Sequence, residues 1–71
     1  MARSHRGFSV GDVVIIKDDY DGKITYHSGI IKSIAPSMHI FVFHILDEND
    51  YTWDCAFEEI RHSVRSGRLM V

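Results

Sequence analysis

Asp21-Gly22 separates two apolar, β-branched runs, and this dipeptide constrains the fold more strongly than any other feature of the chain. Both central positions of a two-residue hairpin turn need positive φ angles, which aspartate tolerates and glycine adopts freely. The first run, residues 13–16, is too short for a helix and is flanked by turn residues. We therefore expect residues 13–16 and 24–34 to pair as a β-hairpin, in which Gly29 marks a bend or a close backbone approach.

Three further strands are expected along the rest of the chain. Residues 39–46 form a continuous apolar run, which predicts a strand buried on both faces. Residues 51–56 are rich in types that favour a pleated surface. The next segment fits either an amphipathic helix across residues 57–67 or a tight turn at 57–59 followed by a strand at 60–62. We favour the turn and strand, because four strands need a fifth to cover an exposed edge.

These elements predict an all-β fold: a small, five-stranded, strongly bent antiparallel half-open barrel, with a short C-terminal helix as the alternative at its end. The length of 71 residues allows one domain, near the lower limit at which a core stabilises a fold unaided. We expect a flexible basic tail at residues 1–7, the barrel at residues 8–62, and a C-terminal tail or short helix at residues 63–71.

The acidic residues are concentrated in two segments that also carry aromatic residues. Of the 10 aspartates and glutamates, seven lie within residues 18–22 and 47–54, each of which follows an apolar run and is expected to be a hairpin turn. If the fold brings the two turns together, they form a negative, aromatic-rimmed mouth suited to a cationic ligand. The basic residues lie at the chain ends and in single positions, which is unlike the basic stripe of a nucleic-acid binder.

The order of these residues resembles a Tudor domain over about residues 8–62. The first half of the pattern is Phe8-x-Val10-Gly11-Asp12, the Asp-Gly turn, and Tyr26-His27-Ser28-Gly29-Ile30-Ile31-x-x-Ile34. The second half is Phe41-x-Phe43, an acidic turn, Tyr51-x-Trp53-Asp54, and Glu58-Glu59-Ile60. The resemblance implies a reader of methylated lysine or arginine in a histone or ribonucleoprotein tail, and hence a nuclear protein, with the cytoplasm as the alternative location. In that family an aromatic cage holds the methylammonium group by cation–π attraction.

The resemblance assigns the cage residue by residue, and the first position departs from the family pattern. Where the family commonly has an aromatic residue at the end of the first strand, this chain has Asp18, and Tyr20 is the nearest substitute. The position in the second strand falls on Tyr26 or on His27, depending on the alignment of the longer turn.

The remaining cage positions come from the second half of the pattern. The position in the third strand falls on Phe43 or His44, and the position in the turn falls on Tyr51. We expect Trp53 to serve in the core or to cover an edge. The expected ligand-binding residues are Tyr20, Tyr26, Phe43 and Tyr51 as aromatic faces, and Asp47, Glu48 and Asp50 as the negative rim.

Two alternatives to a methyl reader are kept. One is a scaffold barrel that mediates protein–protein contacts in a larger assembly, motivated by the aspartate at position 18. The other is nucleic-acid binding through Arg61, Arg65 and Arg68 with the N-terminal arginines. We expect either a monomer or a part of a larger protein.

Composition and spacing argue against several other classes of function. Cys55 is the sole cysteine, which argues against a disulfide framework, and the histidines lack the spacing of metal ligands. No apolar run is long enough to cross a membrane. Cys55 with a histidine is the only nucleophile pairing, and nothing in the sequence positions it. We therefore expect no enzyme activity, no metal, no cofactor and no membrane association.

Overall fold

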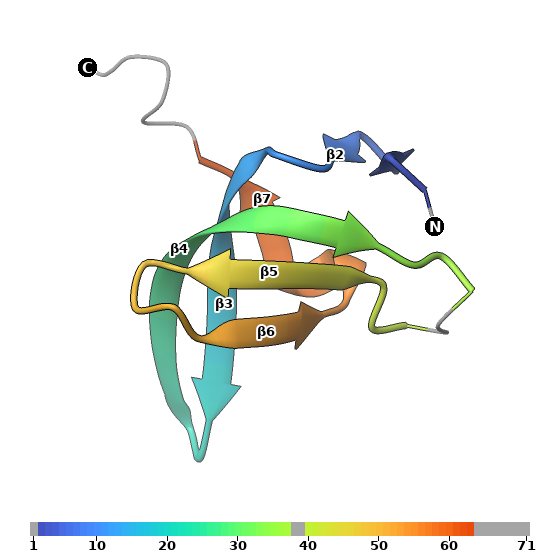
Figure 1. Cartoon of the computed structure of the whole chain (residues 1–71). Coiled ribbons are helices and arrows are strands. Elements are labelled where there is room, and N and C mark those ends of the chain that lie inside the picture. The colour runs from blue at the N-terminus through green and yellow to red at the C-terminus, as the bar shows by residue number, and fades with distance from the viewer. Residues whose placement is uncertain (1, 38–39, 64–71) are drawn as a thin grey trace.

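The architecture comes from a computed structural model, which describes residues 2–37 and 40–63 (Figure 1). The described part is all-β, with two antiparallel sheets and a single 3₁₀ turn. The small sheet pairs β1 (Ser4–His5) with β2 (Phe8–Ser9). The main sheet has the strand order β6-β5-β4-β3-β7. Its strands are β3 (Val13–Tyr20), β4 (Lys23–Ile34), β5 (Phe43–Asp47), β6 (Thr52–Cys55) and β7 (Ile60–His62).

The β3–β4 hairpin is confirmed, and it is longer than expected. Its turn is Asp21-Gly22 alone, with φ angles of 54° and 76°. Because a two-residue turn of this kind follows the twist of its strands, pairing continues up to the pair Tyr20↔Lys23. The prediction that residues 18–22 are a turn is therefore wrong for Asp18, Asp19 and Tyr20, which belong to β3.

The close backbone approach expected at Gly29 is also confirmed. A Cβ atom at this position would lie 2.6 Å from Ile45 Cγ2 and 2.8 Å from the carbonyl oxygen of Leu46. The register between β4 and β5 then shifts between Ile31 and Ser33, which marks a bulge. Figure 1 shows β4 curving along its length past the shorter strand β5. Glycine allows the two strands to approach at this point, and the bulge allows β4 to continue beyond it.

The third strand begins later than predicted. β5 starts at Phe43, whereas the apolar run suggested a start at residue 39, which lies outside the described residues. Ile40 and Phe41 are 62% and 49% exposed, so this part of the run is not buried on both faces as expected. The reason is a loop closed by the hydrogen bond from the amide of Ala35 to the carbonyl of Val42, at 2.9 Å, where the pairing of β4 with β5 ends.

The chain closes as the preferred alternative predicted. A 3₁₀ turn, η1 (Phe57–Glu59), is followed by β7, which pairs with β3. The amide of Ala56 donates a hydrogen bond to Glu59 Oε1 at 2.7 Å and fixes the start of the turn. A helix across 57–67 is wrong for the described residues, since β7 occupies 60–62; residues 64–71 lie outside the described part.

One face of the main sheet forms the core. Its buried side chains are Phe8, Val14, Ile16, Ile31, Ile34, Val42, Phe43, Ile45, Cys55 and Ile60. The N-terminal segment lies over this core, because the Phe8 ring contacts the Phe43 ring at 5.5 Å and stacks on the His62 ring at 4.4 Å. Residues 4–5, expected to belong to a tail, form β1, and the mobility of residues 1–7 stays a prediction. Among the described residues, no helix has the length and apolar character needed to span a bilayer.

Replacing Gly29 tests the close approach of β4 to β5. We expect Gly29→Ala to lower the free energy of unfolding by about 1–3 kcal/mol, because the added methyl group forces a backbone or side-chain shift in a packed core. Urea unfolding followed by the fluorescence of Trp53, the single tryptophan, measures the change. Ser28→Ala, at the neighbouring position on the opposite face, is the control and is expected to change stability by less than about 0.5 kcal/mol. Equal stability of the two variants would contradict this role for Gly29.

Candidate functional site

The turn between β5 and β6 is organised by the carboxylate of Asp47. Asp47 Oδ1 accepts hydrogen bonds from the amides of Asn49 at 2.8 Å and Tyr51 at 2.9 Å. Asp47 Oδ2 accepts a third hydrogen bond from the indole Nε1 of Trp53 at 2.7 Å. Asp50 occupies the left-handed region with a φ of 62°, which lets the chain reverse. A single buried side chain therefore fixes both the turn and the orientation of the indole.

These donors also set the charge of Asp47. The Trp53 indole N–H lowers the pKa of the Asp47 carboxyl group, and the amides of Tyr51 and Asn49 and the nearby His27 lower it further. Burial opposes them, because it disfavours the charged form, and the net pKa is below the usual range. Asp47 is therefore ionised throughout the neutral range and keeps its three hydrogen bonds.

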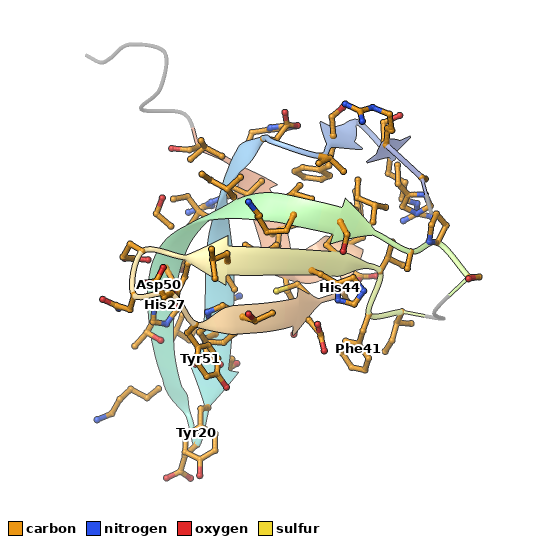
Figure 2. All side chains as sticks on the ribbon, in the orientation of Figure 1. Tyr20, His27, Phe41, His44, Asp50 and Tyr51 are labelled. Carbon is orange, nitrogen blue, oxygen red and sulfur yellow. The ribbon has the colours of Figure 1, made fainter. Side chains whose placement is uncertain are left out.

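Three rings meet beside this carboxylate, and we call them the aromatic corner: Tyr51, Trp53 and His27. The Tyr51 and Trp53 ring centroids are 5.2 Å apart with an interplanar angle of 76°, so the edge of one ring packs against the face of the other. The His27 ring lies 4.9 Å from the Trp53 ring at 32°, and its Nε2 lies 3.2 Å from Thr25 Oγ1. Tyr51 is 61% exposed. Figure 2 shows Tyr51, His27 and Asp50 at the end of the sheet where β5 joins β6.

The register of the strands explains why the corner forms there. Paired residues on neighbouring strands share a face, so His27 lies on the core face with its partner Ile16, and Trp53 lies on that face with its partner Ile45. Both strands extend beyond the packed core at this end. The rings of β4 and β6 therefore meet at its edge, half-buried, instead of inside it.

Part of the first acidic segment lies on the same face. Asp18 and Tyr20 follow Ile16 at two-residue intervals on β3, so both share the face of the aromatic corner. Burial and, to a smaller extent, the carboxylates of Glu59, Asp54 and Asp18 together raise the pKa of the Cys55 thiol on β6 to about 12. The Asp18 charge is therefore felt at β6. The fold thus turns one acid and one tyrosine of the first segment to the face that carries the aromatic corner. Figure 2 shows Tyr20 at the tip of the hairpin, and the joining of the two segments into a mouth stays a prediction.

Two of the four expected aromatic faces lie elsewhere. Tyr26 pairs with Lys17 on the opposite, outer face of the hairpin, where the Arg61 guanidinium lies 5.6 Å from its ring centroid. Phe43 is completely buried, because alternation along β5 turns it into the core. Phe41 precedes β5 and is exposed, and Figure 2 shows it at the other end of β5 from Tyr51. None of these three rings belongs to the aromatic corner.

The acids of the second segment are also divided among several positions. Asp47 is an internal acceptor and not an exposed rim. Glu48 lines a hollow on the outer face, and Asp50 is exposed in the turn. Asp54 is paired with His44 on the outer face, where Asp54 Oδ1 lies 2.6 Å from His44 Nδ1. His44, the alternative third-strand position, is therefore no part of the corner.

Two residues of the aromatic corner, His27 and Trp53, are not among the ligand-binding residues expected from the sequence. His27 stood as the alternative to Tyr26, and Trp53 was assigned to the core or to an edge. The signal for His27 lies in the hairpin turn: counting back from the pair Tyr20↔Lys23 places His27 opposite Ile16. The count assigns His27 to the core face only when Ile16, and not Ile15, is known to face the core, and both residues are isoleucine.

Metal-ligating and nucleophilic side chains are largely separated in the described part of the chain. Within 2–37 and 40–63, no three histidine, cysteine, aspartate or glutamate side chains come together in a way that holds a metal ion. The Cys55 thiol is buried and free, and with a pKa of about 12 it is protonated at neutral pH. The chemistry available at the aromatic corner is recognition by ring faces and negative charge.

The role of Asp47 predicts a specific pH dependence of stability. Because folding lowers the pKa of Asp47, its ionised form stabilises the fold above the unfolded-state pKa, and this contribution is lost as the pH falls through the folded-state value. We expect Asp47→Asn to be less stable than the parent at neutral pH and the two to converge as the pH is lowered through about 4. Thermal unfolding across this range measures the difference. A stability gap that stays constant down to acid pH would contradict the assignment.

The comparisons with known proteins leave the chain without an assigned family. No protein-family model matches it, and neither the curated proteins nor the solved structures include one with significant similarity. The resemblance to Tudor domains therefore rests on the residues themselves.

Proposed function

We propose that the chain is a non-catalytic binding module, a small half-open barrel of the Tudor type, that takes a methylated lysine or arginine side chain in a basic peptide at the aromatic corner. In this proposal the peptide belongs to a histone or ribonucleoprotein tail and the protein works in the nucleus. The observation that carries the proposal is the pair of nearly perpendicular rings, Tyr51 and Trp53, fixed beside an ionised carboxylate.

The electrostatics of the corner favour a cation. Aromatic faces attract a cation through their quadrupole, and two perpendicular faces can contact one charged group together. The Asp47 carboxylate accepts the hydrogen bond of the Trp53 indole N–H. Asp18 lies on the core face of β3, which also carries the aromatic corner, and Asp50 is exposed in the turn. These carboxylates provide a negative potential over the rings.

The hydrogen bonding of Asp47 favours a methylated cation over an unmodified one. A carboxylate has about four acceptor positions, and three donors of the protein already occupy Asp47. An unmodified lysine ammonium brings three N–H donors that need acceptors, whereas methylation replaces these donors with apolar surface. A corner made of ring faces, with its nearest carboxylate largely occupied, therefore suits the methylated group better.

Replacing each of two tyrosines by alanine, in separate variants, tests the location of the binding site. Tyr51→Ala removes one wall of the corner, and we expect it to weaken binding of a trimethyllysine or dimethylarginine peptide about two- to thirtyfold, the equivalent of one cation–π contact. Tyr26→Ala is the matched control, because this tyrosine is also exposed but lies on the opposite face. Isothermal titration calorimetry measures both affinities. Equal binding by Tyr51→Ala and the parent, or an equal loss in the two variants, would contradict the proposal.

A scaffold barrel is the second candidate function. It is favoured by one observation: Phe43 is buried and Tyr26 faces away, so two of the four expected rings are missing from the corner. A scaffold would leave the corner without a small ligand. Chemical-shift titration with methylated peptides separates the candidates, because a scaffold predicts no saturable shifts of Tyr51, Trp53 or His27.

A further inference from the structure

The outer face of the main sheet carries an apolar row that the aromatic corner does not use. Leu46, Ile30 and Val13 are cross-strand partners on β5, β4 and β3, and we call them the outer row. Ile30 is 44% and Val13 is 42% exposed. The three side chains line a shallow hollow of about 210 Å³ together with Ser28, Gly29, Asp47 and Glu48. These adjacent, partly exposed side chains give the outer face an apolar patch that a second surface can contact.

The neighbouring row on the same face has charges of opposite sign at its two ends. The amide of Glu48 donates a hydrogen bond to the carbonyl of Ser28 at 3.1 Å, which places Glu48 beside β4. Ser28 pairs with Ile15, and Ile15 pairs with Arg61 on β7. We call this the charged row: Glu48, Ser28, Ile15 and Arg61. Both ends are exposed, and a small and an apolar residue lie between them.

Other charged groups lie close to the positive end of the charged row. Lys17, Glu58 and Glu59 line a hollow with Arg61 and Tyr26. Glu59 already accepts the hydrogen bond from the amide of Ala56. Arg61 pairs with Ile15 and so ends the row that begins at Glu48, and its guanidinium lies 5.6 Å from the centroid of the Tyr26 ring.

A two-fold rotation makes the charged row complementary to itself, and it does the same for the Ile30–Val13 pair of the outer row. Consider a second copy placed face to face, with the rotation axis parallel to the strands and running between β3 and β4. Glu48 then meets the partner's Arg61, Ser28 meets the partner's Ile15, and Ile30 meets the partner's Val13. Each contact occurs twice, as in any isologous dimer. The negative end of the charged row in each copy then lies opposite the positive end in the other copy, which gives two ion pairs per dimer.

We propose that the chain associates with a second copy of itself through the outer and charged rows. The two sheets pack face to face at about 10 Å, the usual spacing for stacked sheets. A domain of 71 residues buries a small core, and oligomerisation is one of the ways in which such domains gain stability. The aromatic corner is on the core face at the sheet end, so both copies keep it accessible and the association does not depend on the proposed ligand.

Sedimentation equilibrium of the full chain over a wide concentration range tests the association. We expect the mass to rise from 8.2 kDa toward twice that value as the concentration increases. Ile30→Lys introduces a charge in the centre of the outer row and is expected to keep the protein monomeric. Ile24→Lys is the control: Ile24 is 48% exposed on the same hairpin but outside both rows, and its substitution leaves the association unchanged.

Exchanging the charges of Glu48 and Arg61 tests whether the outer face forms the contact and whether the contact is two-fold symmetric. Glu48→Lys alone and Arg61→Glu alone each place like charges against one another twice per dimer, and each is expected to weaken association by roughly tenfold or more. The double variant Glu48→Lys/Arg61→Glu restores the opposite pairs and is expected to recover association. A parent chain that stays monomeric at every concentration overturns the proposal, and so does a dimer unaffected by Ile30→Lys or a double variant no better than the single ones.

Discussion

The Asp47 carboxylate is the interaction on which the site depends. It accepts hydrogen bonds from two backbone amides and from the Trp53 indole, and these three bonds close the turn between β5 and β6. The indole in turn lies against the His27 ring of β4 and makes an edge contact with the Tyr51 ring at an interplanar angle of 76°. One ionised side chain thus converts a loop of acidic and aromatic residues into a fixed surface. Without this carboxylate, the two amides and the indole N–H would be left without a hydrogen-bond acceptor unless they reached water, and an unpaired buried donor destabilises the fold.

The rest of the fold positions that surface by the lengths and bends of its strands. The tight turn at Asp21-Gly22 lets β3 and β4 extend beyond the core, which carries Asp18 and His27 to the same end as Trp53. Gly29 lets β4 approach β5 closely enough for this extension to lie against the second hairpin. The same register places the outer and charged rows on the opposite face. The sheet therefore presents two distinct surfaces, one aromatic and acidic, the other apolar with charges at its ends.

Much of the fold could be predicted from local signals, whereas the composition of the site could not. The Asp-Gly turn, the close approach at Gly29 and the closing strand after residues 57–59 all follow from turn chemistry and the need to cover an edge. The site depends on which face each residue occupies, and the run Val13-Val14-Ile15-Ile16 is apolar at every position. Alternation therefore gave no preference between Tyr26 and His27. The burial of Asp47 and its three internal donors, which make it a structural acceptor, are revealed by no sequence pattern.

The Trp53 indole N–H is the most direct reporter of a methylated cation bound at the aromatic corner. It hydrogen-bonds to Asp47, and its ring belongs to the corner. A titration of the labelled protein with trimethyllysine, dimethylarginine and unmodified peptides follows its NMR resonance. We expect a saturable shift of the indole resonance with a methylated peptide, together with shifts of Tyr51 and His27, and a weaker response to the unmodified peptide. An indole resonance that stays unchanged with every peptide, or that moves equally with all of them, would contradict this expectation.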